Sequence, residues 1–219
     1  MTTTAPHFIY FADPMCSWCY GFAPVIEALA KHFDERLPVR LVMGGLRAGN
    51  REPMREKDRT YIRGAWKSVG EASGQPFDEA FFERETFTYD TEPACRAVVA
   101  MRRLAPEAAL AFKGRVSSAF YAHNRDVTRE DVLADLGQDA GMDRARFLAE
   151  LQSEETKTET FGDFLIAKQA GVEGFPLLAA GREATGYALV TQGFRPIDGL
   201  VAAIEDWLAK GSPVNTDAR

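Results

Sequence analysis

The sequence contains few of the residues that build disulfide-rich or membrane proteins. Only three of its 219 residues are cysteines, too few for a disulfide scaffold, and only three are histidines. No apolar run approaches the roughly 18 residues that a membrane-spanning helix needs. No lysine or arginine precedes Lys31, so the basic start of a secretory signal is missing. These absences predict a cytoplasmic protein with no membrane partner, whose paired cysteines serve catalysis or metal binding.

The overall composition is acidic and rich in core-forming residues. The chain has 26 Lys and Arg residues against 32 Asp and Glu residues, a net charge of −6, which opposes binding to nucleic acid. Apolar residues make up 46% and aromatic residues 11%, which excludes a disordered or fibrous chain. At about 150 residues a domain, the length fits one large domain or two small ones.

Two of the three cysteines lie together in the segment Cys16-Ser17-Trp18-Cys19. Residues 7–12 before them are apolar and aromatic and predict a buried strand, which Asp13-Pro14 ends. Residues 21–31 after them have apolar side chains at helical spacing. The cysteine pair is therefore expected at a junction between a strand and a helix.

This position has a chemical consequence for the first cysteine. The unpaired N–H groups and the dipole of a helix N-terminus favour negative charge, and CxxC thiols have pKa values of about 3.5–7.5. We expect Cys16 to be an acidic, nucleophilic thiol. Cys19 lies three residues further on the same side and is expected to act as the resolving thiol.

Two other interpretations of the cysteine pair remain open. A closed zinc site needs four ligands, and the remaining candidates show no paired metal-ligand spacing. The pair is also compatible with two buried, unreactive thiols. The candidates for further zinc ligands are Cys95, His7, His32 and His123.

A second informative segment runs from Gly171 to Gly181. Pro176 opens an apolar strand there, a position at which the missing N–H of proline is tolerated. A cis bond between Phe175 and Pro176 would turn the preceding backbone outward, so that its N–H and C=O groups face an extended substrate.

Together, residues 13–22 and 171–176 resemble the DsbA-like thioredoxin-fold oxidoreductases, specifically their FrnE-like branch. The resemblance implies an α/β thioredoxin fold, in which a central mixed β-sheet is flanked by helices and interrupted by an all-α helical insertion. It implies that Pro176 lies against Cys16, and that Pro24 matches the proline that kinks the active-site helix. The implied site contains two thiols, a cis-proline and three substrate-binding neighbours: Cys16, Cys19, Pro176, Trp18, Gly174 and Phe175.

Three residues near the implied site have competing interpretations. Trp18 and Phe175 have aromatic surfaces for an apolar peptide or a small aromatic molecule, although partial burial against the helical insertion explains them equally well. Asp13 is either a proton acceptor for Cys19 or a cap of the following helix, and we favour the cap. Cys95 is interpreted as a buried packing residue, because free cysteine behaves mostly as a small hydrophobe.

The rest of the chain accounts for its length. Residues 39–43 and 185–192 predict strands, and residues 196–210 predict a helix with one apolar stripe. The middle of the chain has mostly helical patterns, and residues 158–170 form a final helix before the proline loop. We predict a thioredoxin-like domain of residues 1–46 and 155–219, interrupted by a helical insertion domain of residues 47–154.

The sequence thus predicts a thiol-disulfide oxidoreductase with a dithiol active centre. Its partners are disulfide- or thiol-containing proteins or small molecules. No cofactor is expected, although glutathione remains open as a co-substrate. The alternatives are a glutathione-dependent transferase or isomerase, of the kappa-class or 2-hydroxychromene-2-carboxylate isomerase type, and a non-catalytic metal-binding or chaperone-like module. The direction of electron flow, the natural substrate and the oligomeric state are not determined.

Overall fold

The computed structural model describes residues 5–210. The outer ends of the predicted thioredoxin-like domain, residues 1–4 and 211–219, lie outside this range. No helix within the described range has the length and apolar character needed to cross a membrane.

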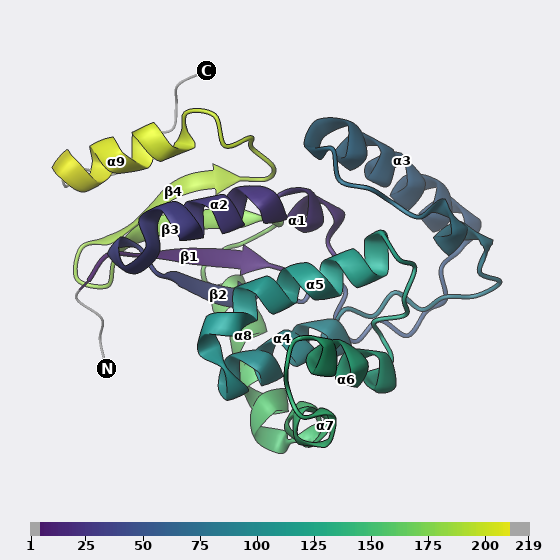
Figure 1. Cartoon of the computed structure of the whole chain (residues 1–219). Helices are drawn as coiled ribbons and strands as arrows, with labels where there is room; N and C mark the ends of the chain where they lie inside the picture. Colours follow the sequence, from purple (N-terminus) through teal and green to yellow (C-terminus); the bar gives the residue numbers. More distant parts are fainter. Residues whose placement is uncertain (1–4, 211–219) are drawn as a thin grey trace.

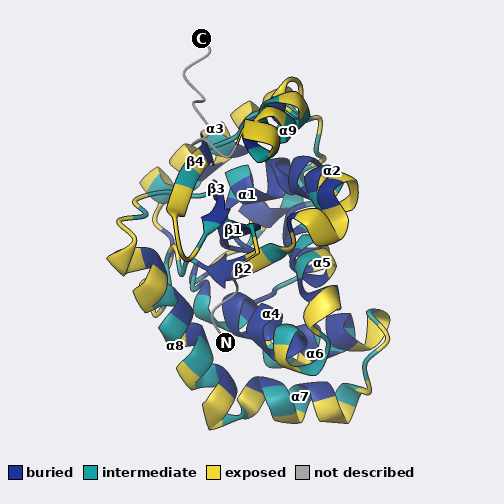
Figure 2. Cartoon of the chain, turned by 90° about the vertical axis from the view of Figure 1, so that its left-hand side faces the viewer, coloured by how far each residue is buried: buried dark blue, intermediate teal, exposed yellow. Residues whose placement is uncertain are grey.

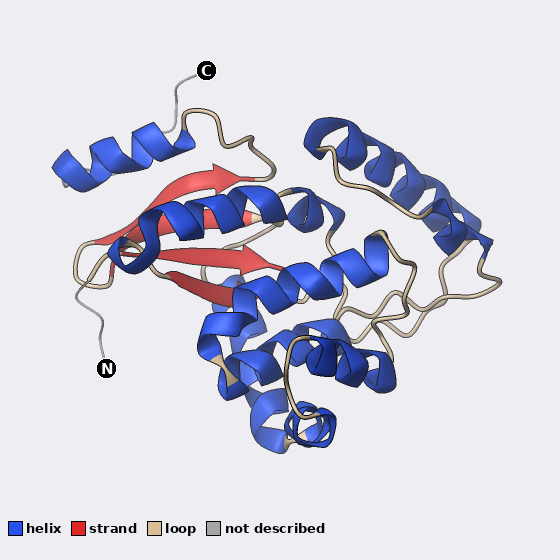
Figure 3. Cartoon of the chain, viewed as in Figure 1, coloured by secondary structure: helices blue, strands red, loops and turns tan. Residues whose placement is uncertain are grey.

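A four-stranded mixed sheet forms the centre of the fold (Figures 1 and 3). Its strand order is β2-β1-β3-β4, with β1 parallel to β2 and antiparallel to β3, and β3 antiparallel to β4. This confirms the predicted α/β class with a mixed sheet. The strands are β1 (His7–Ala12), β2 (Val39–Met43), β3 (Leu177–Arg182) and β4 (Gly186–Gln192).

Strand β1 is an apolar run because both of its faces are covered. Phe8 and Tyr10 point into the main core, whereas Phe11 packs on the opposite face with Val42 and Ala167. Figure 2 shows the inner strands as buried and the outer sides of the surrounding helices as exposed. The end of β1, where the cysteine segment begins, is thereby held between two packed layers.

Six α-helices separate β2 from β3 in the chain, as the helical patterns predicted. The stretch at residues 77–82 is an exception, because it contains the 3-10 turn η2 (Glu79–Glu83) in place of an α-helix. The boundaries of a separate insertion domain remain a prediction. The helices are α3 (Glu56–Ser73), α4 (Glu92–Leu104), α5 (Ala109–Tyr121), α6 (Glu130–Asp139), α7 (Arg144–Gln152) and α8 (Glu154–Gln169), and the short turn η3 (Pro106–Ala108) precedes α5.

The helix after the cysteine segment is divided in two. Helix α1 (Ser17–Gly21) ends before Phe22, and α2 (Ala23–Phe33) then begins, followed by the turn η1 (Asp34–Arg36). Pro24 lies in the first turn of α2, so its expected place in the interior of a helix is wrong. The first turn suits proline because the N–H groups there have no partner within the helix. Helix α9 (Leu200–Lys210) completes the fold.

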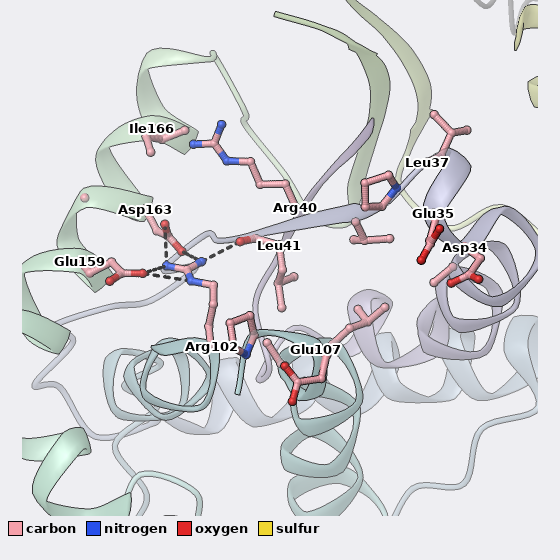
Figure 4. Close-up of a pocket in the computed structure, with 17 residues that line it drawn as sticks. Asp34, Glu35, Leu37, Arg40, Leu41, Arg102, Glu107, Glu159, Asp163 and Ile166 are labelled. Atoms are coloured by element: carbon pink, nitrogen blue, oxygen red, sulfur yellow. Dashed lines mark hydrogen bonds and ion pairs between the residues drawn. The ribbon is translucent and has the colours of Figure 1, made fainter. Parts of the chain in front are cut away.

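Arg102 on α4 joins β2 to α8, as Figure 4 shows. Its guanidinium donates to the carbonyl oxygen of Leu41 at 2.7 Å, to Asp163 at 2.9 Å and to Glu159 at 2.7 Å. Asp163 in turn accepts the backbone N–H of Met43 at 2.9 Å. These contacts satisfy polar groups on the outer edge of β2, where no further strand pairs.

We expect Arg102→Leu to lower the free energy of unfolding by about 3 kcal/mol at pH 7, because it leaves the carboxylate of Asp163 buried without its cation. Burial already raises the pKa of Asp163, and loss of Arg102 raises it further. Protonation therefore removes the unpaired charge as the pH falls, so the deficit relative to wild type shrinks between pH 7 and pH 5. Urea unfolding at both pH values measures this. The double variant with Arg102→Leu and Asp163→Asn should recover part of the lost free energy of unfolding. If the deficit of Arg102→Leu were the same at pH 7 and pH 5, the assigned role of the Asp163 carboxylate would be contradicted.

Candidate active site

The cysteine pair lies where the sequence placed it, between β1 and the helices α1 and α2. Cys16 is the N-cap residue of α1 and Cys19 lies within that helix. Cys16 is 6% exposed and Cys19 is fully buried, and neither forms a disulfide. The arrangement brings both thiols to one end of the central strand, with Cys16 nearer the surface.

The proline loop packs against the first cysteine. The Phe175-Pro176 bond is cis, as expected, and it directly precedes β3. The Cys16 thiol donates to the carbonyl oxygen of Phe175 at 3.5 Å, across 159 positions of sequence. The predicted meeting of the two segments is therefore confirmed, whereas the catalytic role of Pro176 stays a prediction.

The three predicted substrate neighbours differ in their environments. Trp18 is partly buried, and its ring packs on Phe194 after β4, with ring centroids 5.9 Å apart. The ring of Phe175 fills the space next to Gly44. A side chain added at Gly174 would meet no atom within 4 Å. Their contact with substrate remains a prediction.

Asp13 does not cap the following helix, so the favoured interpretation of this residue is wrong. No side chain caps α1. One carboxylate oxygen of Asp13 instead accepts the backbone N–H of Met15 at 2.8 Å, and the other accepts that of Leu46 at 2.7 Å. Asp13 is fully buried and joins the cysteine loop to the segment after β2. Its position three residues before Cys16 did not reveal this second partner.

Cys95 lies close to the same carboxylate. Its thiol is fully buried on α4 and donates to Asp13 at 3.4 Å. Burial and the Asp13 carboxylate raise the pKa of Cys95 well above its ordinary value, so the thiol stays protonated and neutral. This environment fits the packing role expected from the sequence.

Three polar side chains from the helical region hold the cysteine loop by its carbonyl oxygens. Ser117 donates to Pro14 at 2.7 Å and Tyr89 to Met15 at 2.6 Å. Lys113 donates to the carbonyl oxygen of Cys19 at 2.8 Å. The sequence analysis missed all three residues. A lysine and a serine in a helical pattern normally face solvent, and no local signal marks these as buried.

The acidic character expected for Cys16 is not found in the reduced protein. A hydrogen bond with Cys19, burial, and the charges of Cys19 and Asp13 together raise the pKa of Cys16 well above its ordinary value. The helix N-terminus acts in the opposite direction. The expectation rested on the helix N-terminus and on the usual range of CxxC thiols, whereas burial and the neighbouring carboxylate both oppose a thiolate.

One hollow of the described chain lies away from the cysteines. It has a volume of about 730 Å³ and lies beside β2 and α8, with Arg40, Glu107 and Ile166 among its lining residues (Figure 4). Within residues 5–210 no group of three or more His, Cys, Asp or Glu side chains is placed to hold a metal ion.

Known proteins resemble the chain over most of its length. The DSBA-like thioredoxin domain family matches residues 8–205. A candidate protein disulfide isomerase from Nitrosomonas europaea is 38% identical, with a TM-score of 0.87, over 95% of this chain and 100% of that one. The cytosolic disulfide reductase DsbM from Pseudomonas aeruginosa is 25% identical, with a TM-score of 0.75, over 93% of this chain and 98% of DsbM.

Curated relatives share a similar region but are longer. The ClpXP adapter protein SpxH of Halalkalibacterium halodurans is 25% identical over 170 residues, which are 76% of this chain and 55% of SpxH. The chain spans about half the length of the curated relatives it matches. The family match extends over both the cysteine segment and the proline loop. The chain therefore belongs to the DSBA-like thioredoxin domain family.

Proposed function

We propose that this protein acts as a disulfide reductase in the cytoplasm, using Cys16 as the nucleophile and Cys19 as the resolving thiol. The observation that carries the proposal is the contact between the Cys16 thiol and the carbonyl oxygen of Phe175 at the cis-proline. It places the reactive sulfur beside a backbone segment that an extended disulfide substrate can pair with. The partners we propose are therefore disulfide-containing proteins or peptides.

The reaction proceeds in two exchange steps. The Cys16 thiolate attacks one sulfur of the substrate disulfide, and the other substrate sulfur leaves as a thiolate and takes up a proton. Cys19 then loses its proton and attacks the sulfur of Cys16 in the mixed disulfide. The second substrate thiolate leaves, and a disulfide between Cys16 and Cys19 remains. Two electrons have passed from the dithiol to the substrate.

The electrostatics of the site support the reducing direction. Strongly oxidising dithiol proteins owe their high potential to a stabilised reduced form with a very acidic thiol. Here the pKa of Cys16 is raised by Cys19, by burial and by Asp13, so the reduced form gains little from a thiolate. A dithiol of this kind gives up its electrons more readily. The similar protein DsbM, a cytosolic disulfide reductase, agrees with this direction.

Glutathione is the reductant we propose for the return step. Two glutathione thiols would reduce the disulfide between Cys16 and Cys19 through a mixed disulfide, with formation of oxidised glutathione. The support comes from DsbM of Pseudomonas aeruginosa, which was also solved with GSH and is 24% identical over 93% of this chain. In a glutathione transferase of the kappa type, turnover of an aromatic electrophile would survive Cys16→Ser. In a reductase it would not.

The test is a Cys19→Ser variant incubated with a disulfide peptide and with cell extract. We expect mixed disulfides through Cys16 that dithiothreitol releases, because the second step is blocked. Equilibration of the wild-type dithiol with glutathione should give a potential nearer to about −270 mV than to about −120 mV. Absence of any trapped species, together with no reduction of the peptide, would overturn the proposal. A potential near about −120 mV would overturn the proposed reducing direction.

A further inference from the structure

Lys113 on α5 is a buried cation directly behind the cysteine pair. It is 1% exposed, and its ammonium donates to the carbonyl oxygen of Cys19 at 2.8 Å. Within residues 5–210 it forms no ion pair with a carboxylate, although an ammonium can donate three hydrogen bonds. A charge buried without a counter-charge is strongly destabilising, so its placement calls for a compensating negative group.

The surroundings of Lys113 identify that group. Asp13 uses both carboxylate oxygens on the N–H groups of Met15 and Leu46, and Glu27 is exposed on α2. The hydroxyl group of Tyr10 is buried and has no hydrogen-bond partner in the described chain. Besides the Asp13 and Glu27 carboxylates, the dithiol is the place near Lys113 where negative charge forms during the reaction. The ring centre of Tyr10 on β1 lies 5.9 Å from the ammonium. The other charged and titratable groups that face Lys113 are Cys16 and Cys19 of the active-site segment, Asp13 after β1, and Glu27 on α2.

We propose that Lys113 is a positioning residue of the redox centre, whose buried ammonium holds the Cys19 carbonyl and stabilises the thiolate that forms at Cys16. The proposal rests on the function proposed above. In the oxidised protein the disulfide carries no charge, so only Asp13 and Glu27 supply negative charge near the ammonium. In the reduced protein a thiolate adds a further counter-charge. Lys113 therefore favours the reduced, reactive form and offsets part of the unfavourable effect of burial on Cys16.

The coupling between the two groups is reciprocal. Burial lowers the pKa of Lys113, whereas negative charge on Cys19 and Cys16 raises it. By linkage, the ammonium must lower the pKa of the thiol by as much as the thiolate raises that of the lysine. Besides Lys113, the groups that face Cys16 are Cys19, Asp13, Tyr10 on β1, Tyr89 before α4 and Tyr121 on α5.

The test compares Lys113→Met with wild type, both carrying Cys19→Ala so that one thiol of the pair titrates. The rate of Cys16 alkylation by iodoacetamide is followed from pH 6 to pH 10.5. We expect Lys113→Met to move the inflection upward by about one pH unit, a tenfold slower alkylation at neutral pH. Ser117→Ala is the matched control, because it removes a hydrogen bond from α5 to the same loop without changing charge.

An upward shift of the inflection in the alkylation rate that occurs in Lys113→Met and not in Ser117→Ala supports the proposal. Equal shifts in both variants, or none, overturn it, because docking of α5 alone would then explain the contact. If Lys113→Met does not fold, the wild-type protein answers the question. The ¹³Cε resonance of Lys113 should titrate at higher pH in the reduced than in the oxidised protein, and identical titration would overturn the proposal. Neither readout requires turnover, so both are independent of the substrate-trapping test.

Discussion

Cys16→Ser is expected to abolish disulfide reduction, lowering the rate by at least about a thousandfold. A thiolate is the nucleophile in thiol-disulfide exchange, and a serine hydroxyl neither ionises near neutral pH nor forms a disulfide with the substrate. The loss should be larger at pH 9 than at pH 7, because the raised pKa of Cys16 makes the wild-type thiolate more abundant at the higher pH, whereas no pH in this range makes the serine a nucleophile. Reduction of a fluorogenic disulfide peptide, with dithiothreitol or glutathione as electron source, measures the effect.

Two other cysteine variants separate the reactive thiols from the packing thiol. Cys19→Ser should stop turnover but still allow one attack by Cys16. Cys95→Ala should keep the activity within about twofold and lower the free energy of unfolding by about 1 kcal/mol, because it removes a buried sulfur and its weak hydrogen bond to Asp13. If Cys95→Ala lost activity as fully as Cys16→Ser, the assignment of two reactive thiols and one packing thiol would be wrong.

Gly44→Ala is expected to lower activity by about tenfold to a hundredfold and the free energy of unfolding by about 1–3 kcal/mol. Gly44 follows β2, and its N–H donates to the carbonyl oxygen of Ala12 at 2.8 Å. A methyl group at this position would overlap the ring of Phe175. The ring must then move, and the carbonyl oxygen that accepts the Cys16 thiol moves with it.

The cause of this effect is lack of space, and a second variant tests that cause. Gly44→Ala combined with Phe175→Leu should regain most of the lost stability in thermal unfolding, because the smaller side chain makes room for the methyl group. Gly162→Ala on α8 is the control: no atom lies within 4 Å of the added methyl group. It should keep full activity and raise the stability by up to about 1 kcal/mol. If Gly44→Ala left the free energy of unfolding unchanged, the predicted overlap of the added methyl group with the Phe175 ring would be contradicted.

The elements around the redox centre were largely predictable because their signals are local. The strand at residues 39–43 matches β2, and the apolar run at residues 7–12 matches β1. The pattern of residues 196–210 gave α9, although the helix begins only at Leu200. The division of the active-site helix at Phe22 was missed, because helical spacing continues across it. A hydrophobic pattern records which face is buried and not whether every backbone hydrogen bond is made.

The candidate site was only half predictable, for a related reason. The CxxC pair and the proline carry distinctive residue types, so the sequence marked them, and the family resemblance brought them together. The polar groups beneath the dithiol are ordinary residues. Lys113 lies 94 positions from Cys19 and Leu46 lies 33 positions from Asp13. No periodicity indicates which of several lysines or aspartates is buried.

By itself, the sequence indicated the fold class, the cysteine pair and the cis-proline loop, because the motifs that carry the family resemblance are short stretches of distinctive residue types. The tertiary structure decided the chemical state of those thiols. The pKa of Cys16 depends on burial and on the charges that surround it. Burial and charge proximity arise only when β1, α1 and α5 pack together. The same packing turned Asp13 from an expected helix cap into a buried carboxyl group beside the redox centre.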